Sequence, residues 1–301
     1  MKRACLSVVA VVLFSGFSAF SGGPIYMSTK GIFAHRGASK LYPENTSMAL
    51  RAAVASGAQG VEIDIRFTKD QQLVLMHDSK VNRTTDGKGY VRNLTLAEIK
   101  KLDAGVWKHK AFAGERVPTF REALAVLPKN IWINLHIKES ETLLEVAKII
   151  KATRREHQSL FAIFAPDIEA LRKFDPNLKI INMTRTLSNS TYVDNTLNLG
   201  ADGMQFYGEF SMVKPNDVTK AHNAGLMTFN SGINNPKKIE KLFKMGVDFV
   251  LADDPVAALK VFHSVTNFYS VGYSVWAKEP LHLRKSTKLG FMPELIEVQT
   301  R

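Results

Sequence analysis

The stretch Val61–His77, VEIDIRFTKDQQLVLMH, contains two β-favouring runs, Val61–Thr68 and Leu73–His77. Only residues 69–72 join them. A parallel crossover needs a dozen or more residues, so the two runs are expected to form an antiparallel hairpin. One member of this hairpin must therefore be additional to any regular parallel arrangement of the other strands.

The length of the turn predicts which residues of the hairpin face each other. A turn centred between Asp70 and Gln71 places His77 opposite Asp64. This register follows from turn length alone, so a slip of one or two residues is allowed for.

Outside the hairpin, short β-rich runs alternate with helical patterns. Further strands are expected at Gly31–His35, Ile131–Ile137, Leu160–Phe164, Leu178–Met183, Gly203–Tyr207, Leu226–Asn230 and Val247–Leu251. Helices are expected at Ser47–Ala55, Leu96–Leu102, Phe120–Leu127, Ser140–Arg155, Asp167–Phe174, Thr191–Leu199, Pro215–Ala224 and Pro236–Met245. Alternation of this kind predicts an α/β fold with a parallel sheet, and eight units fit a (β/α)8 TIM barrel. An open doubly wound sheet is the alternative, but no glycine-rich dinucleotide turn follows the first strand.

Three segments lie outside this pattern. Residues 1–21 start with Lys2 and Arg3 and continue in an apolar run too short for a confident membrane span, which predicts a signal peptide and a secreted or periplasmic protein. Residues 79–116, rich in polar residues and glycine, are expected to form an inserted subdomain after the hairpin. Residues 265–301 are expected to form an appendage outside a catalytic domain at 29–264.

Composition and charge narrow the partners. With 45% hydrophobic residues the 301-residue chain can build a normal core. The formal net charge of +12 suits anionic small molecules or an anionic membrane surface, and also an ordinary basic surface with no partner. No nucleic-acid motif is present, so nucleic acid is not an expected partner, and the oligomeric state stays open. The single cysteine, Cys5, lies in the predicted signal peptide, which excludes thiol catalysis from the mature chain.

Ionisable residues gather near the ends of several expected strands. Glu62 and Asp64 are two residues apart and share one face of their strand, as do His136 and Lys138 on another. Active sites of (β/α)8 barrels lie at the C-terminal ends of the strands. Paired carboxylates suit a hard divalent cation such as Mg²⁺ or Ca²⁺.

Two further strand ends carry histidines, His35 and His77. Histidines beside a metal can serve as general acid and base near neutral pH, while Arg36 and Lys138 can hold an anionic group such as phosphate. Each residue also has an ordinary structural explanation, as a buried histidine, a rim ion pair or a rim charge. Their joint placement favours metal-assisted chemistry on an anionic ester.

Four blocks in this order and spacing resemble the glycerophosphodiester phosphodiesterase family, within the superfamily of phosphodiesterases similar to phosphatidylinositol-specific phospholipase C. They are Ala34–Gly37 (AHRG), Pro43–Thr46 (PENT), Glu62–Asp64 (EID) and His77-Asp78. The resemblance covers residues 31–260. It implies a TIM barrel with a small insertion and the hydrolysis of glycerophosphodiesters to glycerol 3-phosphate and an alcohol.

The resemblance also implies residue roles. His35 and His77 correspond to the acid–base pair, and Glu62 and Asp64 to ligands of Ca²⁺ or Mg²⁺. The remaining matched positions are the phosphate contacts Arg36 and Lys138 and the supporting residues Glu44 and Asn45.

Two positions depart from the family pattern. His136 stands where the family has a third metal-binding glutamate, and a neutral, softer imidazole shifts preference towards Mn²⁺ or Zn²⁺. Phe229 stands where the family has a tryptophan, which keeps an aromatic wall for the substrate without its N–H donor. Two alternatives to the phosphodiesterase stay open: an exported phospholipase of C or D type acting on whole lipids, and a non-catalytic phosphodiester-binding barrel.

Overall fold

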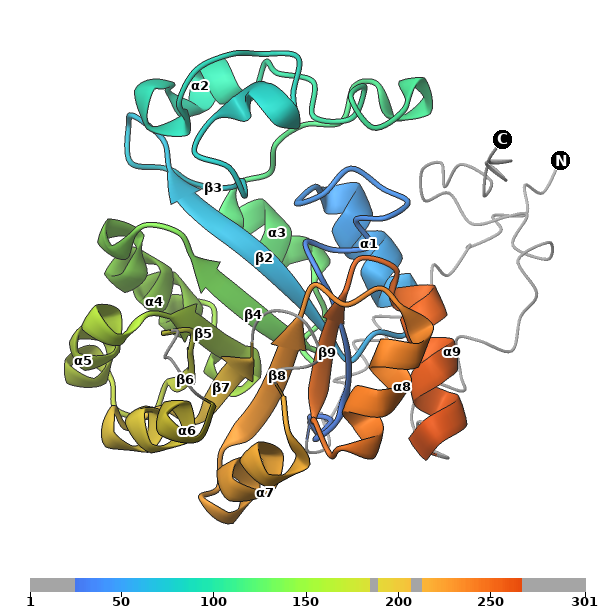
Figure 1. Cartoon of the computed structure of the whole chain (residues 1–301). Coiled ribbons are helices and arrows are strands. Elements are labelled where there is room, and N and C mark those ends of the chain that lie inside the picture. The colour runs from blue at the N-terminus through green and yellow to red at the C-terminus, as the bar shows by residue number, and fades with distance from the viewer. Residues whose placement is uncertain (1–24, 185–188, 207–212, 267–301) are drawn as a thin grey trace, which may run out of the picture.

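Eight parallel strands form a closed barrel in the computed structural model, which describes residues 25–184, 189–206 and 213–266. The strands are β1 (Gly31–Ala34), β2 (Gly60–Phe67), β4 (Trp132–Ile137), β5 (Ser159–Ile163), β6 (Lys179–Asn182), β7 (Gly203–Phe206), β8 (Met227–Ser231) and β9 (Phe249–Ala252). They are ordered β1-β9-β8-β7-β6-β5-β4-β2, and the pairing of β1 with β2 closes the ring (Figure 1). The predicted (β/α)8 barrel is confirmed.

The remaining strand, β3 (Leu73–Leu75), runs antiparallel to β2, as the short connection requires. Its register differs by one residue from the expected one: Ile65 lies opposite Leu75, and Met76 rather than His77 donates its N–H to the carbonyl of Asp64. The physical reason is that the turn contains three residues, 69–71. It is therefore centred on Asp70 and not between Asp70 and Gln71. Gln71 adopts φ 56°, the left-handed conformation that a three-residue hairpin loop uses at its last position.

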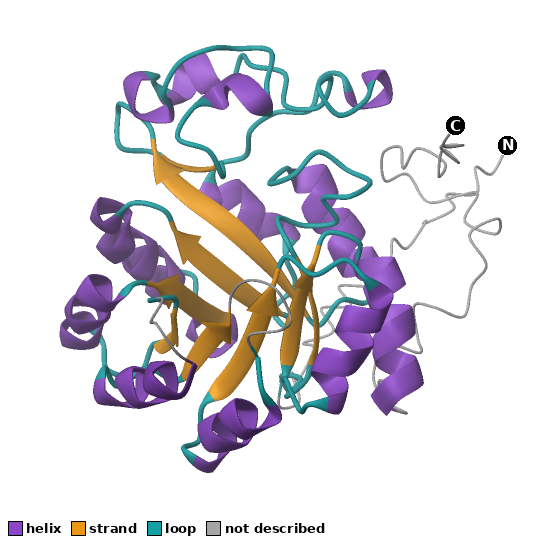
Figure 2. Ribbon diagram, in the orientation of Figure 1, coloured by secondary structure: helices purple, strands orange, loops and turns teal. Residues whose placement is uncertain are grey.

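Helices surround the barrel (Figure 2). They are α1 (Ser47–Ala55), α3 (Phe120–Val126), α4 (Leu143–Ala152), α5 (Ala165–Phe174), α6 (Asn189–Asn198), α7 (Pro215–Asn223), α8 (Pro236–Lys244) and α9 (Pro255–Thr266), with α2 (Leu96–Ile99) in the insertion. The eight expected helices are present, α1 with the expected bounds and the others with shifted ends, whereas α9 was not expected. Its sequence signal is Pro255 in the first turn, followed by the buried Ala258, Leu259 and Phe262 at helical spacing.

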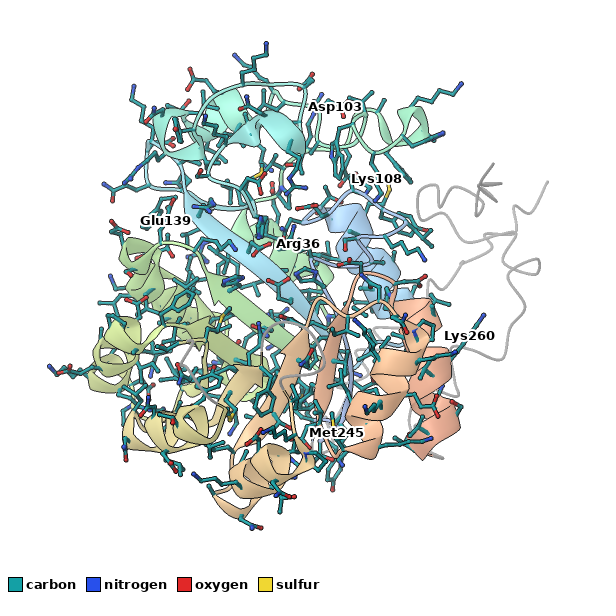
Figure 3. All side chains as sticks on the ribbon, viewed as in Figure 1. Arg36, Asp103, Lys108, Glu139, Met245 and Lys260 are labelled. Atoms are coloured by element: carbon teal, nitrogen blue, oxygen red, sulfur yellow. The ribbon has the colours of Figure 1, made fainter. Side chains whose placement is uncertain are left out.

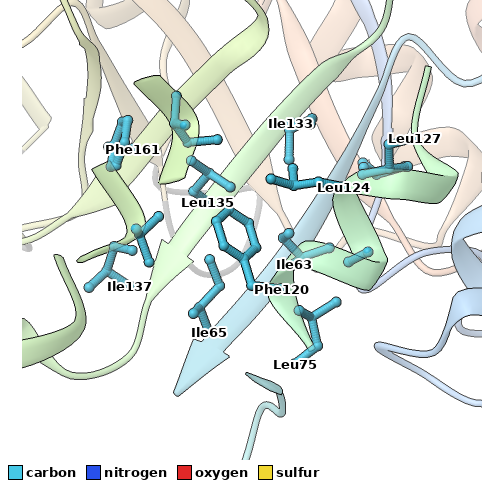
Figure 4. Close-up of a cluster of buried hydrophobic side chains, with 14 of the residues drawn as sticks. Ile63, Ile65, Leu75, Phe120, Leu124, Leu127, Ile133, Leu135, Ile137 and Phe161 are labelled. Atoms are coloured by element: carbon cyan, nitrogen blue, oxygen red, sulfur yellow. The ribbon is translucent and has the colours of Figure 1, made fainter. Parts of the chain in front are cut away.

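Strand alternation separates the two faces of the barrel wall. Ile63, Ile65 and Leu135 point outwards and pack against Phe120 of α3, whose start is fixed by a capping box at Thr119 (Figure 4). Burying each such side chain contributes about 1.5–3 kcal/mol. The intervening residues of β2 and β4 must therefore point into the barrel, and these are the polar ones.

The floor of the barrel is aromatic. The rings of Phe33, Phe229 and Phe249 are in mutual contact, with centroids 4.9–5.4 Å apart. Gly60 leaves the space that Phe33 fills, because a Cβ at this glycine would lie 2.5 Å from the Phe33 ring. This floor closes the barrel beneath the polar side chains at its mouth.

The segment 79–116 lies beyond the C-terminal end of β2, at the top of Figure 1. It contains α2 and short 3₁₀ turns, and Val81, Val91 and Ile99 form a small core with Val74 and Met76 at the β3 end of the hairpin. Because the hairpin carries it, the insertion stands over the C-terminal mouth of the barrel.

The predicted terminal segments fall largely outside the described residues. Residues 1–21 lie wholly outside them, and of the predicted appendage only residues 265–266 are described, as the last turn of α9. Within the described ranges, none of the helices combines the length and the apolar character needed to cross a membrane.

Candidate active site

Three side chains that can hold a metal meet inside the mouth of the barrel. Asp64 and His136 are cross-strand partners on β2 and β4, and Nδ1 of His136 lies 3.0 Å from Asp64 Oδ1 and 3.4 Å from Glu62 Oε1. One ligand atom from each of the three lies within 4.8 Å of the others. Two buried carboxylates and a partly buried imidazole form a donor set suited to a divalent cation.

The carboxyl group of Asp64 is held in its ionised form. Asp64 is fully buried, and its Oδ1 makes no well-formed hydrogen bond but faces His136 and, at 3.2 Å, Nζ of Lys138. Burial raises the pKa of this carboxyl, yet the close approach and charge of His136 and the charges of Lys138 and Arg36 outweigh burial and hold the pKa well below its ordinary value. A buried carboxylate that remains ionised has an oxygen available for a metal.

His35 lies on one side of this cluster, directly after β1. Its Nε2 is 4.0 Å from Glu62 Oε2, and its Nδ1 is 2.7 Å from Oδ1 of Asp253, the residue that follows β9. Asp253 is itself fixed by Nδ2 of Asn234 at 2.7 Å. Burial lowers the pKa of His35, but the hydrogen bond to Asp253 and the charge of Glu62 raise it by more, so the net shift is upward.

His77 follows β3 and has a carboxylate of its own. Its Nδ1 lies 2.7 Å from Oδ1 of Asp78, and burial lowers its pKa. Arg83, from the insertion, donates to both oxygens of Asp78 and to both oxygens of Glu44 at 2.7–2.9 Å. The insertion thus holds the carboxylate that orients His77.

Two residues beside the cluster have strained backbones. Arg36 and Asn45 adopt φ 57° and 56°, a left-handed conformation that non-glycine residues seldom take. The strain lets the Arg36 N–H donate to Glu62 Oε2 at 2.9 Å, and Asn45 Nδ2 donate to Asp64 Oδ2 at 2.8 Å. Backbone strain of this kind concentrates at functional sites.

The remaining cations stand over the carboxylates. Arg36 Nη1 donates to Glu44 Oε1 at 2.9 Å while its Nε lies 3.5 Å from Asp64. Lys138 Nζ is 3.4 Å from Nδ1 of His136. Two basic side chains next to two buried carboxylates form a site for an anionic group such as a phosphate.

Of the residues expected at the site, the structure brings together nine and leaves one apart. His35, His77, Glu62, Asp64, His136, Arg36, Lys138, Glu44 and Asn45 all lie around the mouth of the barrel. Phe229 does not join them: it is 0% exposed in the aromatic floor between Phe33 and Phe249. It therefore forms no wall against a substrate in this structure. The prediction was wrong on this point because the position of a residue along its strand does not give the depth of its side chain in the barrel.

Asp253 and Arg83 were not expected as site residues. Asp253 is 218 residues from His35 in the chain, and its signal is a carboxylate directly after the closing strand. Arg83 lies among several basic residues of the insertion and has no distinguishing local signal.

A closed (β/α)8 barrel with histidines, carboxylates and basic residues at its C-terminal mouth has the architecture of a TIM-barrel enzyme with a site for an anionic substrate. A family model described as "Glycerophosphoryl diester phosphodiesterase family" matches residues 35–257. The chain belongs to this family and is a phosphoric diester hydrolase.

Curated relatives and solved structures agree. A glycerophosphodiester phosphodiesterase of Caldanaerobacter subterraneus subsp. tengcongensis is 34% identical over 232 residues, 74% of this chain and 94% of the relative. A putative glycerophosphodiester phosphodiesterase of Bacillus subtilis is 32% identical over 242 residues, 76% of this chain and 96% of the relative. A phosphodiesterase of Oleispira antarctica, solved with the product sn-glycerol-3-phosphate, superimposes with a TM-score of 0.70 at 28% identity, over 77% of this chain and 96% of the other.

Proposed function

We propose that this chain hydrolyses glycerophosphodiesters to glycerol 3-phosphate and an alcohol, with a divalent metal at Glu62, Asp64 and His136 and with His35 and His77 as its acid–base pair. One observation carries the proposal. His35 lies 4.0 Å from Glu62, and His77 is close enough to Asp64 to respond to its charge. Each histidine hydrogen-bonds to a carboxylate through Nδ1, so that Nε2 is the nitrogen left for proton transfer.

The chemistry follows from this arrangement. One histidine takes the proton of a water, or of a neighbouring hydroxyl of the glycerol, while the oxygen attacks phosphorus. The bond from phosphorus to the alcohol oxygen breaks, and the other histidine gives that oxygen a proton. When attack comes from the glycerol hydroxyl, water then opens the cyclic phosphate by the same two proton transfers in reverse.

The charged residues around the histidines serve the same reaction. Arg36 and Lys138 hold the phosphate oxygens and oppose their growing negative charge. Asn45 holds Asp64 in place, and Glu44 holds the guanidinium of Arg36. A bound divalent metal would supply further electrostatic stabilisation of the negative charge on the phosphate.

The composition of the metal site suggests which ions it takes. His136 replaces an oxygen ligand by a softer nitrogen, so we infer that Mn²⁺ or Zn²⁺ competes better here than at three carboxylates, although Mg²⁺ and Ca²⁺ stay compatible with Glu62 and Asp64.

Assay of glycerophosphocholine hydrolysis with EDTA, and then with Mg²⁺, Ca²⁺, Mn²⁺ or Zn²⁺ restored, tests metal dependence. We expect EDTA to abolish the activity and at least one ion to restore it. Full activity in EDTA would overturn the metal part of the proposal and leave the histidine part to be judged separately.

We further propose that the protein is exported, on the support of the basic and apolar pattern of residues 1–21. Fractionation of producing cells, with sequencing of the mature N-terminus, tests this. A mature chain starting near Gly22 outside the cytoplasm is expected, and a full-length chain in the cytoplasm would contradict export.

A further inference from the structure

A cleft of about 520 Å³ opens beside His35, between the mouth of the barrel and the insertion. His35 and Arg36 line it from the barrel, and Trp107 and Lys108 from the insertion, and its walls do not include Glu62, Asp64 or His136. The volume falls in the range of pockets that hold small organic ligands and exceeds what a three-carbon glycerol fills. The cleft therefore adjoins His35 without being lined by the three candidate metal ligands.

Lys108 is the distinctive cation of this cleft. Its Nζ donates to the carbonyl oxygen of Ser39 at 2.8 Å, which brings the insertion against the loop after β1; Figure 3 shows Lys108 above Arg36. The other cations of the walls, Arg36, Lys40 and Arg83, each form an ion pair with a carboxylate. Within the described part of the chain Lys108 forms no such pair, and Glu44 and Asp253 act on its charge only from a greater distance. An ammonium has three donors, so this half-buried side chain has donors left for a ligand.

The same cleft is poorly suited to a cationic group. Lys108 Nζ lies 5.6 Å from the centroid of the Trp107 ring, so a cation already stands over that ring. The two carboxylates in the walls are also engaged: Glu44 binds Arg36 and Arg83, and Asp253 binds His35. A trimethylammonium group would find a cation already on one face of the Trp107 ring and no unpaired carboxylate among the wall residues.

We propose that this cleft is the subsite for the alcohol part of the substrate and that Lys108 selects acceptor-rich head groups without positive charge, such as polyols, over choline. The proposal rests on the proposed function, because it takes the phosphorus to lie between the two histidines. It also makes His35 the residue next to the leaving oxygen, since the cleft starts at this side chain.

Steady-state kinetics with glycerophosphoinositol and glycerophosphocholine tests the proposal. The unaltered enzyme should have the higher kcat/KM for the inositol ester. Lys108→Met should lower that kcat/KM about tenfold or more, mainly through KM, and leave the choline ester unchanged or improved, because it removes a charged hydrogen bond to one substrate alone. Lys108→Arg should retain most of the preference. The exposed Lys110, two residues away, supplies the control Lys110→Met, which should change neither ester.

An unchanged ratio of the two kcat/KM values in Lys108→Met, with both esters still hydrolysed, would overturn the subsite and leave the proposed reaction intact. Calorimetric binding of both esters to His77→Ala, with and without Lys108→Met, gives a second readout that does not need turnover. Tighter binding of the inositol ester, lost on adding Lys108→Met, is expected; equal binding of the two esters to His77→Ala would overturn the subsite.

Discussion

Nδ1 of His35 lies 2.7 Å from Oδ1 of Asp253, so a side-chain hydrogen bond joins the residues that follow the paired first and last strands at the mouth of the barrel. The bond fixes the direction of the imidazole and leaves Nε2 facing the carboxylate cluster. His77 and Asp78 repeat this relationship within two consecutive residues.

Asp253→Asn should lower kcat about 10- to 100-fold with a smaller change in KM, because the amide no longer favours the same orientation and tautomer of His35. Asp253→Glu should recover part of the loss. A purely structural role would lower the melting temperature without separating kcat from KM.

Asp253 also predicts a pH dependence of stability. Burial raises its pKa, but the hydrogen bond and charge of His35 hold it at about 2, below the ordinary value of 3.8. A carboxyl with a depressed folded pKa stabilises fully above its unfolded pKa and loses this contribution as pH falls towards the folded value.

The difference in melting temperature between the unaltered protein and Asp253→Asn should therefore be largest near neutral pH and shrink between about pH 5 and 2. Thermal melts followed by circular dichroism measure it. Glu141→Gln, at an exposed carboxylate just before α4, is the control. A difference that stays constant from pH 7 to 3 would contradict this explanation.

Arg83→Gln should reduce kcat roughly tenfold. Among the described residues, Arg83 is the only side chain that joins Asp78 to Glu44, and a neutral glutamine would hold Asp78, the partner of His77, less firmly. Arg92→Gln, on the same insertion, should have no effect. The kcat of Arg83→Lys should lie between that of Arg83→Gln and that of the unaltered enzyme. Lysine keeps the positive charge but cannot reach both carboxylates with a planar fork. A rate for Arg83→Lys equal to that of the unaltered enzyme would show that the fork geometry has no role.

His136→Glu should shift metal affinity towards Ca²⁺ and Mg²⁺ and away from Zn²⁺, because it restores a third oxygen ligand. Isothermal titration of the metal-free protein with each ion measures this independently of activity. The exposed His263 on α9 provides the control His263→Glu. An identical metal profile in His136→Glu and the unaltered protein would show that His136 is not a ligand.

The sequence predicted the barrel and its strands well because apolar runs of β-favouring residues and short connections are local properties. The hairpin at Val61–His77 is the clearest case: its connection excluded a parallel pairing, but its register shifted by one residue because turn type depends on the backbone of Gln71. A left-handed backbone conformation can be anticipated at a glycine, but the identity of a glutamine does not predict it.

The sequence did not predict how deep a side chain lies in the barrel or which residues far apart in the chain come into contact. The aromatic residue at Phe229 was correctly placed on a late strand, yet the side chain belongs to the barrel floor. Asp253 and His35 meet only because β1 and β9 are neighbours in the closed barrel. Lys108 and Ser39 likewise meet only through the fold of the insertion.

The turnover of glycerophosphocholine by His35→Ala and His77→Ala, each with saturating metal, tests the central claim most directly. His222→Ala is the matched control, since His222 Nε2 bonds Asp248 at 2.9 Å where β9 begins, at the opposite end of the barrel. We predict that each mouth variant loses about 10²- to 10⁴-fold in kcat while remaining folded, and that His222→Ala keeps the rate of the unaltered enzyme. Turnover at the unaltered rate in either His35→Ala or His77→Ala would contradict the acid–base pair.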